Sequence, residues 1–370
     1  MKKRDFLYIL MALLMLTGCG EDTADVNMLI QGIERSYSVQ TGEELYLNPV
    51  IVGLTGDVSY DWTVDSESVG SKPEFAMSFS EPGIKYCAFI VNSRESSVIK
   101  PFMVRVYSSP GECDNKIVAH RGGAKECDET IPDNSIAALR YAMELGCYAS
   151  ECDIYVTKDK NVVVAHADGK GKVNGFYPWE ATLAEIREAG TLSNGEQVPT
   201  LEDYLDYAMK GGGCTRIWLD IKNITKPSTL PEPAIDACRQ ACRIIREKKR
   251  EKWVEFICTG NKDVMTVCDE LCRQSGIPIG WMGNAPVKDY LSKGYTWANL
   301  SLAYMDDEWH TGTHTVDEFV SKGVAMSVYN VDEEPAMHFY LSQYDKMKAI
   351  CTNYPAKLIR LARSMQIEDK

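Results

Sequence analysis

The stretch that decides the fold is residues 117–166, IVAHRGGAKECDETIPDNSIAALRYAMELGCYASECDIYVTKDKNVVVAH. Its apolar runs at 117–120 and 148–156 are typical of buried strands, and the amphipathic pattern at 134–145 is typical of a helix. A strand, a helix and a strand in this order predict a parallel β-α-β unit. A third apolar run at 161–166 follows after only a short turn, which permits an antiparallel hairpin but no parallel crossover.

The alternation of strand-like and helix-like runs continues beyond this stretch, so we predict an α/β fold, a (β/α)₈ TIM barrel over residues 116–365. The further strands are expected at 216–221, 253–258, 277–281, 297–301, 324–329 and 348–352. The further helices are expected at 180–189, 200–209, 231–249, 262–274, 315–322 and 333–343.

These runs give one strand more than an eight-stranded barrel holds. We interpret the surplus run, 161–166, as an antiparallel arm that folds back over the barrel mouth. The hairpin turn is expected to be centred between Asp159 and Lys160. In that register His166 lies opposite Asp153, which would bring a distant histidine beside the acidic residues of the preceding strand.

Residues 31–108 have a different texture, with short alternating runs such as Tyr60 to Val64 and Phe102 to Val106 between turn signals. Period-two alternation at this spacing predicts a small all-β sandwich domain. The stretches YDWTVD and EPGIKYCAFIV resemble the PKD-like immunoglobulin-type modules of surface proteins. That resemblance implies a spacer, and residues 109–115 would form the linker to the barrel.

The amino terminus reads as an export signal. Basic residues at positions 2–4 precede a short apolar run, and Leu16-Thr17-Gly18-Cys19 resembles the lipobox of bacterial lipoproteins. The resemblance implies a signal peptide over residues 1–18 and lipidation of Cys19, followed by a polar tether over residues 19–30. We therefore expect an exported bacterial lipoprotein, anchored to a membrane and facing the periplasm or the cell surface.

Charge and cysteine content narrow the class further. A net charge of −13 argues against a nucleic-acid-binding protein, because neutralising phosphates requires clustered Lys and Arg. Beyond Cys19 the chain has twelve more cysteines, too few for a disulfide scaffold of this length. The pairs Cys238/Cys242 and Cys268/Cys272 fall on expected helices and are interpreted mainly as buried apolar residues, with disulfides left open.

Two carboxylates project from one face of the expected strand at 148–156. Glu151 and Asp153 are two residues apart, so both point the same way, and paired anionic oxygens suit a hard divalent cation, Ca²⁺ or Mg²⁺. Asp220, on the expected strand at 216–221, could complete this metal site. Unpaired carboxylates in an interior strand would be costly, which favours a functional role.

Basic groups are expected at the same end of the barrel. His120 ends the first strand and precedes Arg121, whose forked donors suit a phosphate. Lys222 shares a strand face with Asp220 and could be a second phosphate contact. An acid, a base, a metal site and an anion clamp together predict phosphodiester cleavage.

At this point the sequence resembles the glycerophosphodiester phosphodiesterase family, whose pattern is roughly HRG, PENT, E-x-D-V-x-x-TKDG, VV-x-HD, PTLEE, LEIK and TD-x-P. The matching motifs, in the same order, are VAHRG at 118–122, PDNS at 132–135, ECDIYVTKD at 151–159, VVVAH at 162–166, VPTLEDYL at 198–205, WLDIK at 218–222 and TNYP at 352–355.

The resemblance implies metal-dependent hydrolysis of glycerophosphodiesters to glycerol phosphate and an alcohol. Carried over residue by residue, it makes His120 and His166 the acid–base pair. It makes Glu151 and Asp153 metal ligands, and Arg121 and Lys222 phosphate contacts.

The chain departs from the family pattern in places. Asp220 stands where the family usually has glutamate, and PDNS replaces PENT, with Asn134 expected to cap the following helix. Two alternatives stay open. One is a related phospholipase that acts on an intact lipid phosphodiester, and the other is a surface binding protein weakened in catalysis by the change at Asp220.

Overall fold

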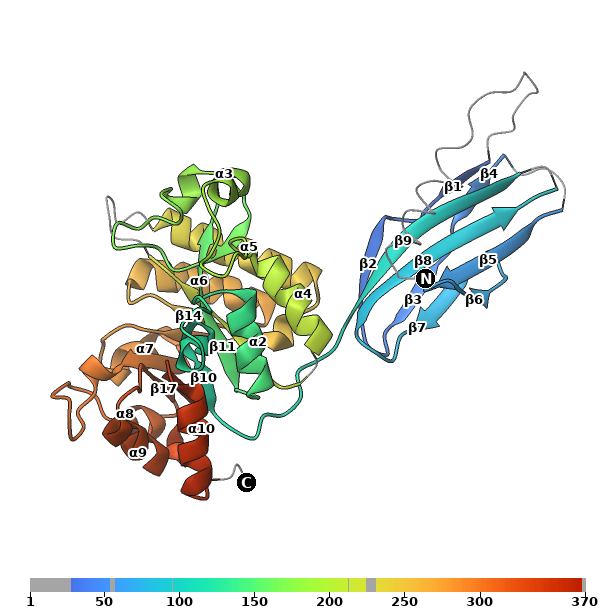
Figure 1. Ribbon diagram of the computed structural model, residues 1–370. Coiled ribbons are helices and arrows are strands. Elements are labelled where there is room, and N and C mark those ends of the chain that lie inside the picture. The colour runs from blue at the N-terminus through green and yellow to red at the C-terminus, as the bar shows by residue number, and fades with distance from the viewer. Residues whose placement is uncertain (1–27, 54–56, 95, 212, 224–230, 368–370) are drawn as a thin grey trace. The chain divides into compact units, whose positions relative to one another are not determined.

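The computed structural model describes residues 28–53, 57–94, 96–211, 213–223 and 231–367 (Figure 1). It divides into two compact units, which are described separately. The signal peptide, Cys19 and most of the expected tether lie outside the described residues. Within the described part no helix is long and apolar enough to cross a membrane.

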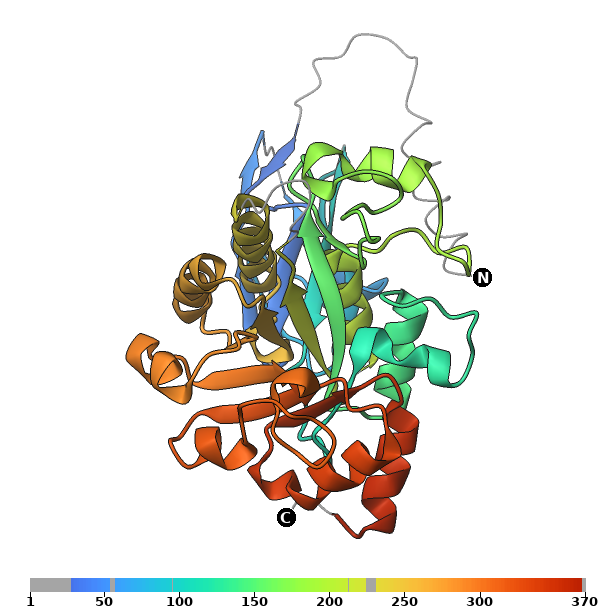
Figure 2. The same ribbon diagram turned by 90° about the vertical axis from the view of Figure 1, so that its left-hand side faces the viewer.

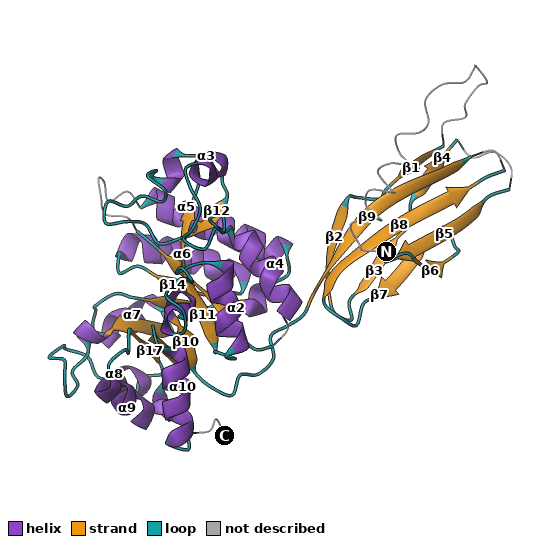
Figure 3. Ribbon diagram, in the orientation of Figure 1, coloured by secondary structure: helices purple, strands orange, loops and turns teal. Residues whose placement is uncertain are grey.

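The amino-terminal region, as far as it is described up to Tyr107, contains strands and loops only (Figure 3). Trp62 lies at its core, stacked on Phe89 with ring centroids 4.0 Å apart and tilted against Phe75 at 4.8 Å. The strands form a five-stranded sheet of order β2-β9-β8-β5-β6 with the pairs β1-β4 and β3-β7, which confirms the predicted all-β region. Their bounds are β1 Leu29–Gln31, β2 Ser36–Gln40, β3 Glu44–Leu47, β4 Val50–Val52, β5 Ser59–Val64, β6 Glu67–Gly70, β7 Phe75–Ser78, β8 Gly83–Asn92 and β9 Ser97–Tyr107.

The carboxyl-terminal region forms a closed barrel of eight parallel strands, because the first strand pairs with both the second and the last. Helices surround these strands (Figure 2). The strands are β10 Ile117–Ala119, β11 Ala149–Val156, β13 Arg216–Ile221, β14 Val254–Cys258, β15 Ile279–Trp281, β16 Trp297–Ser301, β17 Ala325–Tyr329 and β18 Ala349–Thr352, with β12 Val162–Val164 added to β11. Each predicted barrel strand is confirmed.

The helices also follow the sequence pattern, with two exceptions. They are α2 Ile136–Glu144, α3 Leu183–Glu188, α4 Leu201–Gly211, α5 Glu232–Glu247, α6 Lys262–Ser275, α7 Val287–Lys293, α8 Val316–Val320, α9 Glu334–Ser342 and α10 Pro355–Ser364. The sequence analysis missed α7 and α10. For α10 the signal was present, since Pro355 occupies its first turn and Leu358, Ile359 and Ala362 recur at helical spacing on a buried face.

The hairpin arm exists, but its predicted register is wrong by one residue. β12 pairs antiparallel with β11, and the N–H of Ala165 donates to the carbonyl of Asp153 at 3.0 Å, so Asp153 faces Ala165 and not His166. The turn is centred on Asp159 because Thr157 N–H donates to the carbonyl of Asn161 at 2.8 Å. Because the turn is centred on a residue and not between two residues, every cross-strand partner is shifted by one position from the prediction.

The start of α2 also differs from the prediction. Ser135 is the cap, since its hydroxyl accepts from the N–H of Ala138 at 3.0 Å. Asn134 instead turns into the barrel, where its Nδ2 donates to Asp153 Oδ2 at 2.9 Å and its Oδ1 accepts from the N–H of Asp153 at 3.1 Å. The residue expected to cap a helix therefore orients a candidate metal ligand.

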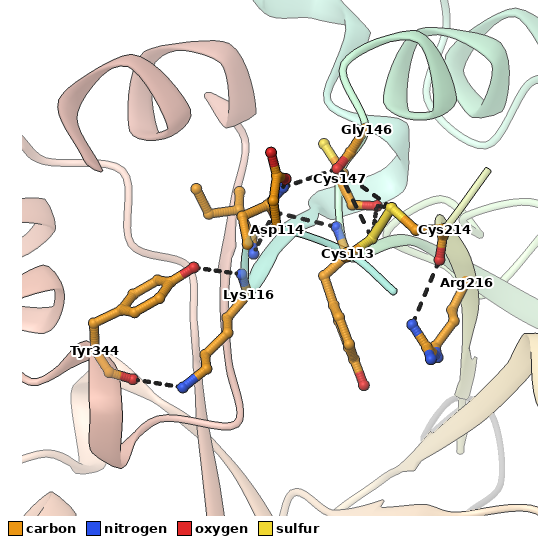
Figure 4. Close-up of a disulfide and its surroundings, with 11 residues drawn as sticks. Cys113, Asp114, Lys116, Gly146, Cys147, Cys214, Arg216 and Tyr344 are labelled. Atoms are coloured by element: carbon orange, nitrogen blue, oxygen red, sulfur yellow. Dashed lines mark hydrogen bonds between the residues drawn. A yellow bond between two sulfur atoms is a disulfide. The ribbon is translucent and has the colours of Figure 1, made fainter. Parts of the chain in front are cut away.

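A disulfide joins Cys113, just before the barrel's first strand, to Cys214, just before β13 (Figure 4). On the other side of this segment, the Lys116 N–H donates to the Tyr344 hydroxyl at 2.7 Å and Lys116 Nζ donates to the Tyr344 carbonyl at 3.0 Å. The disulfide and these hydrogen bonds attach the segment that precedes β10 to the barrel at two places. The sequence analysis did not assign this pairing, because two cysteines 101 residues apart carry no local signal.

Replacing Cys113 and Cys214 by serine should lower the free energy of unfolding by about 2–4 kcal/mol, because the cross-link closes a long loop in the unfolded chain. Urea unfolding monitored by circular dichroism measures the loss. The exposed free cysteine supplies the matched control, since Cys127→Ser should leave the midpoint unchanged. Equal midpoints for the double variant and the wild type would contradict the stabilising role.

Candidate active site

Three carboxylates meet inside the barrel, towards the carboxyl ends of β11 and β13. Glu151 and Asp153 share the inward face of β11, and Asp220 lies on β13 directly opposite Asp153 in the parallel register. These residues are 2%, 0% and 4% exposed, and one oxygen of each lies within 4.8 Å of the others. The structure thus brings together the three acids that the sequence assigned to one metal site.

The cluster rests on an apolar layer in the barrel interior. Trp218 precedes Asp220 by two residues on the same strand face and packs with its neighbour Trp297, their ring centroids 4.9 Å apart. Both belong to a buried cluster with residues from β10, β11, β14 and β18. This layer fills the barrel on the amino-end side of the acids, so the carboxylates lie towards the carboxyl-end mouth.

Two cations lie against this acidic group. Lys222 Nζ lies 2.8 Å from Asp153 Oδ1 and also pairs with Asp220 Oδ2. Arg121 Nε lies 3.3 Å from Asp153 Oδ2, and the backbone N–H of Arg121 donates to Glu151 Oε2 at 2.9 Å. Lys222 and Arg121, the two residues expected to contact phosphate, therefore border the carboxylates. A phosphate bound to a metal ion at the three acids would also lie near these two side chains.

The local backbone brings Arg121 into this position. Its φ of +51° is left-handed, and Gly122 and Gly123 follow with φ of +88° and +62°. A Cβ on Gly122 would lie 2.5 Å from the Cβ of Ala138 on α2. The two glycines are therefore needed for a turn this tight and this close to a helix.

Like charges buried together shift the acidity of the group. Burial raises the pKa of Glu151 well above its usual value, and the charges of Asp153 and Asp220 raise it further. Burial also raises the pKa of Asp220 to about 6, against the lowering effect of Lys222. Burial acts in the same direction on Asp153, but the charges of Lys222 and Arg121 outweigh it and leave the Asp153 pKa lowered.

The ligand set fits a hard divalent cation. Each of the three acids offers a carboxylate oxygen, and Asp220 Oδ1 is buried without a hydrogen-bond partner. A buried orphan acceptor is costly, and a bound Ca²⁺ or Mg²⁺ would satisfy it. Asp220, although one methylene shorter than the expected glutamate, still reaches the other two carboxylates.

His120 is oriented by Asn353, which follows β18, and by Asp332, which follows β17. Asn353 Nδ2 donates to Asp332 Oδ2 at 2.7 Å, which identifies the other amide atom, Oδ1, as an acceptor. That Oδ1 lies 2.7 Å from His120 Nδ1. His120 must therefore carry its proton on Nδ1, and its Nε2, 3.8 Å from Glu151 Oε2, is free of a proton in the neutral ring.

Asn330 supports this assignment. Its Nδ2 lies 3.2 Å from His120 Nδ1, a contact between two donors, while its Oδ1 is buried without a partner. Turning the Asn330 amide over replaces that contact with an acceptor facing the Nδ1 proton. Burial lowers the pKa of His120, so the neutral form prevails at neutral pH.

The sequence analysis missed Asn330, Asp332 and Asn353 as residues of the site. Asn353 lies in the TNYP motif, which marked the position but not its partner. The pairing depends on β10 and β18 being neighbours, since the parallel register places Ala119 beside Thr352 and hence His120 beside Asn353. That adjacency exists only in the closed barrel.

His166 lies on the loop after β12 and is exposed. Partial loss of solvent lowers its pKa and the charge of Asp153 raises it, with a net lowering. The ring therefore stands within electrostatic range of the acidic group. Asp168, two residues after His166, accepts hydrogen bonds from the N–H groups of Lys170 at 2.8 Å and Lys172 at 2.9 Å and so shapes this loop.

Two further histidines, His310 and His314, lie outside this constellation. His310 contacts Asp307 at 2.8 Å and His314 contacts Asn284 at 2.8 Å, so the two histidines have separate partners and do not share a helix.

Comparison with known proteins gives a decisive match. The model of the glycerophosphoryl diester phosphodiesterase family matches residues 120–357, which includes His120, all three acids, Lys222 and Asn353. The chain belongs to this family. Over 103 residues, 24% of the chain, it is 36% identical to a glycerophosphodiester phosphodiesterase of Caldanaerobacter subterraneus, and over 61 residues, 16% of the chain, 38% identical to a human lysophospholipase D. These alignments span 39% and 18% of the two relatives.

Solved structures share the barrel. A glycerophosphodiester phosphodiesterase from Parabacteroides distasonis is 26% identical with a TM-score of 0.57, covering 69% of this chain and all of that one. A phosphodiesterase from Oleispira antarctica in complex with its product sn-glycerol-3-phosphate has a TM-score of 0.51 at 19% identity, over 68% of this chain and 97% of that one. The second likeness establishes the fold alone.

The raised pKa of Asp220 predicts a pH-dependent stability in metal-free buffer. A carboxyl whose folded pKa exceeds its unfolded value stabilises the protein below the unfolded value, here 3.8, and that contribution is lost as pH rises through about 6. Relative to Asp220→Asn, the wild type should therefore lose up to about 3 kcal/mol of unfolding free energy between about pH 4 and pH 7.

Paired urea titrations of the two proteins at each pH measure this difference. Saturating Mg²⁺ or Ca²⁺ should restore stability to the wild type at pH 7 and do less for Asp220→Asn. Parallel pH profiles for the two proteins in metal-free buffer would show that Asp220 is not the titrating group.

Proposed function

We propose that this protein hydrolyses glycerophosphodiesters, the deacylated phospholipids, to glycerol phosphate and an alcohol, with a divalent cation as cofactor. The observation that carries the proposal is the buried group of Glu151, Asp153 and Asp220 with its orphaned Asp220 Oδ1, set beside an oriented histidine. Membership of the family agrees with this chemistry.

The three acids would hold Ca²⁺ or Mg²⁺, which supplies positive charge against the phosphate oxygens. Arg121 and Lys222 border the same space and stabilise the additional negative charge that develops on phosphorus-bound oxygens in the transition state. Because both cations are paired with buried carboxylates, their positions are fixed before substrate arrives, which limits the reorganisation required during the reaction.

We assign the general base to His120 and the general acid to His166. The Nδ1 proton of His120 is held by Asn353, so Nε2 is the atom that can accept a proton from the nucleophile. As the nucleophile's oxygen bonds to phosphorus, the bond from phosphorus to the leaving alkoxide breaks. His166, which must enter this step as the protonated imidazolium, then donates a proton to that alkoxide and becomes neutral, and exchange with solvent restores both rings.

The nucleophile is either water or a neighbouring hydroxyl of the glycerol moiety, which would pass through a cyclic phosphate. Phosphorus NMR during turnover distinguishes the two. A transient cyclic phosphate supports the internal route, whereas incorporation of solvent oxygen without such an intermediate excludes it.

A turnover assay on glycerophosphocholine and glycerophosphoinositol, with and without chelator, tests the function. We expect activity that needs Mg²⁺ or Ca²⁺, and a fall of about 10²–10⁴-fold in kcat for His120→Ala, since a positioned proton-transfer group contributes that much. His338→Ala is the matched control because His338 is exposed on α9. Absence of metal-dependent turnover on any phosphodiester would favour the alternative of a surface binding protein weakened in catalysis.

Two exposed aromatic residues favour the alternative function, a phospholipase that acts on an intact lipid phosphodiester. Trp309 and Tyr354 are 46% and 43% exposed and lie on the loops that follow β16 and β18. Loops after parallel barrel strands border the mouth, so two exposed aromatic rings stand where an acyl chain or a lipid surface would approach. One relative is named as a lysophospholipase D. Higher kcat/KM for lysophosphatidylcholine than for glycerophosphocholine, lost in a Trp309→Ser/Tyr354→Ser variant, would favour the lipid substrate.

We also propose that the mature protein is an exported lipoprotein attached to a membrane through Cys19. A disulfide between Cys113 and Cys214 supports export, since structural disulfides persist in oxidising compartments.

Replacing Cys19 by alanine tests the anchor. We expect the wild-type protein to enter the detergent phase on Triton X-114 partitioning of whole cells, and Cys19→Ala to remain in the aqueous phase, with Cys127→Ala as control. Aqueous partitioning of the wild type would count against lipidation.

A further inference from the structure

A second cluster of ligand-type side chains lies between two helices of the barrel's outer layer. Cys238 and Cys242 are four residues apart on α5, and Cys268 and Cys272 are four residues apart on α6, the neighbouring helix (Figure 1). Residues at this spacing share one helix face, and here the two faces meet. All four residues are buried.

The sulfur positions suit a tetrahedral ion. The Sγ atoms of Cys238, Cys242 and Cys272 all lie within 4.8 Å of one another, and those of Cys238 and Cys272 are 3.9 Å apart. Four thiolates bound to zinc at about 2.3 Å have sulfurs about 3.8 Å apart, the edge of the tetrahedron. Cys268 is buried on α6 one turn before Cys272 and is the remaining candidate for a fourth sulfur, although only the other three form the close group.

The cluster differs from the disulfide found elsewhere in the chain. Cys113 and Cys214 are bonded, whereas the four helix cysteines are free thiols, three of which converge on one point. A bonded pair would satisfy two sulfurs and turn them away from the others. Cysteines that act only as small apolar residues need no such convergence.

Nearby charges fit a thiolate centre. Zinc with four thiolates carries two negative charges, which would be costly among apolar side chains without compensation. The charge of Arg246 acts on the Cys242 thiol, and the charge of Arg239 acts on the Cys268 thiol. Each half of the cluster thus has a cation within electrostatic range, on the exposed side of α5.

We propose that Cys238, Cys242, Cys268 and Cys272 bind a single thiophilic ion, Zn²⁺, in a closed structural site that joins α5 to α6. Soft thiolates select such an ion, whereas the oxygen-only group of Glu151, Asp153 and Asp220 selects a hard one. Because all four ligands are protein sulfurs and are buried, no position is open to substrate, so the site acts on stability and not on the reaction.

Metal analysis of the full mature chain, purified without added metal or chelator, tests the site. We expect about one zinc per chain, falling to near zero in a Cys238→Ser/Cys272→Ser variant. Cys87→Ser is the matched control, since Cys87 is a buried free cysteine of the amino-terminal region. Asp220→Asn should keep its zinc, which separates this site from the carboxylate group and from the proposed activity.

Cobalt substitution of the wild type keeps the test valid if the double variant does not fold. Co²⁺ in a four-thiolate site gives intense thiolate-to-metal charge-transfer bands, which the carboxylate site cannot produce.

Alkylation of the denatured, unreduced chain followed by mass spectrometry counts the thiols. Four modified helix cysteines together with zinc support the proposal. Disulfides among the four, or four free thiols without zinc or cobalt bands, would overturn it.

Discussion

Three carboxylates buried within 4.8 Å of one another, with one lysine between two of them, are the constraint on which the barrel mouth depends. Such a group is electrostatically unfavourable until positive charge is supplied. Lys222 and Arg121 supply part of it, and the raised pKa of Asp220 shows that the compensation is incomplete. In the proposed function this remaining deficit would favour a divalent cation, because part of the free-energy cost of burying the acids would be recovered when the cation binds.

The orientation of His120 depends on a chain of hydrogen bonds. Asp332 fixes the amide of Asn353, the amide fixes the Nδ1 proton of His120, and the proton-free Nε2 is left facing the acidic group. The first two of these contacts do not involve the three acids, whereas the third is with Glu151. The histidine is therefore oriented by the loops that follow β10, β17 and β18, whereas the three acids lie on β11 and β13.

The sequence predicted the barrel well because its strands are buried on both faces and read as apolar runs, as in 216–221 and 324–329. It predicted the acids for a local reason, since Glu151 and Asp153 share a strand face wherever that strand lies. It failed where an answer depends on one residue of register or on long-range adjacency. The hairpin turn at Asp159 shifted His166 away from Asp153, and Asn353 reaches His120 only through the pairing of the first and last strands.

That pairing has a consequence for how competence is acquired. A chain in which β18 has not yet docked already contains both histidines, the three acids and their cations, yet His120 lacks the partner that fixes its protonated nitrogen. Catalytic competence therefore does not accumulate strand by strand. It arises when the barrel closes, so partly folded chains would lack activity even though they contain the complete set of signature residues.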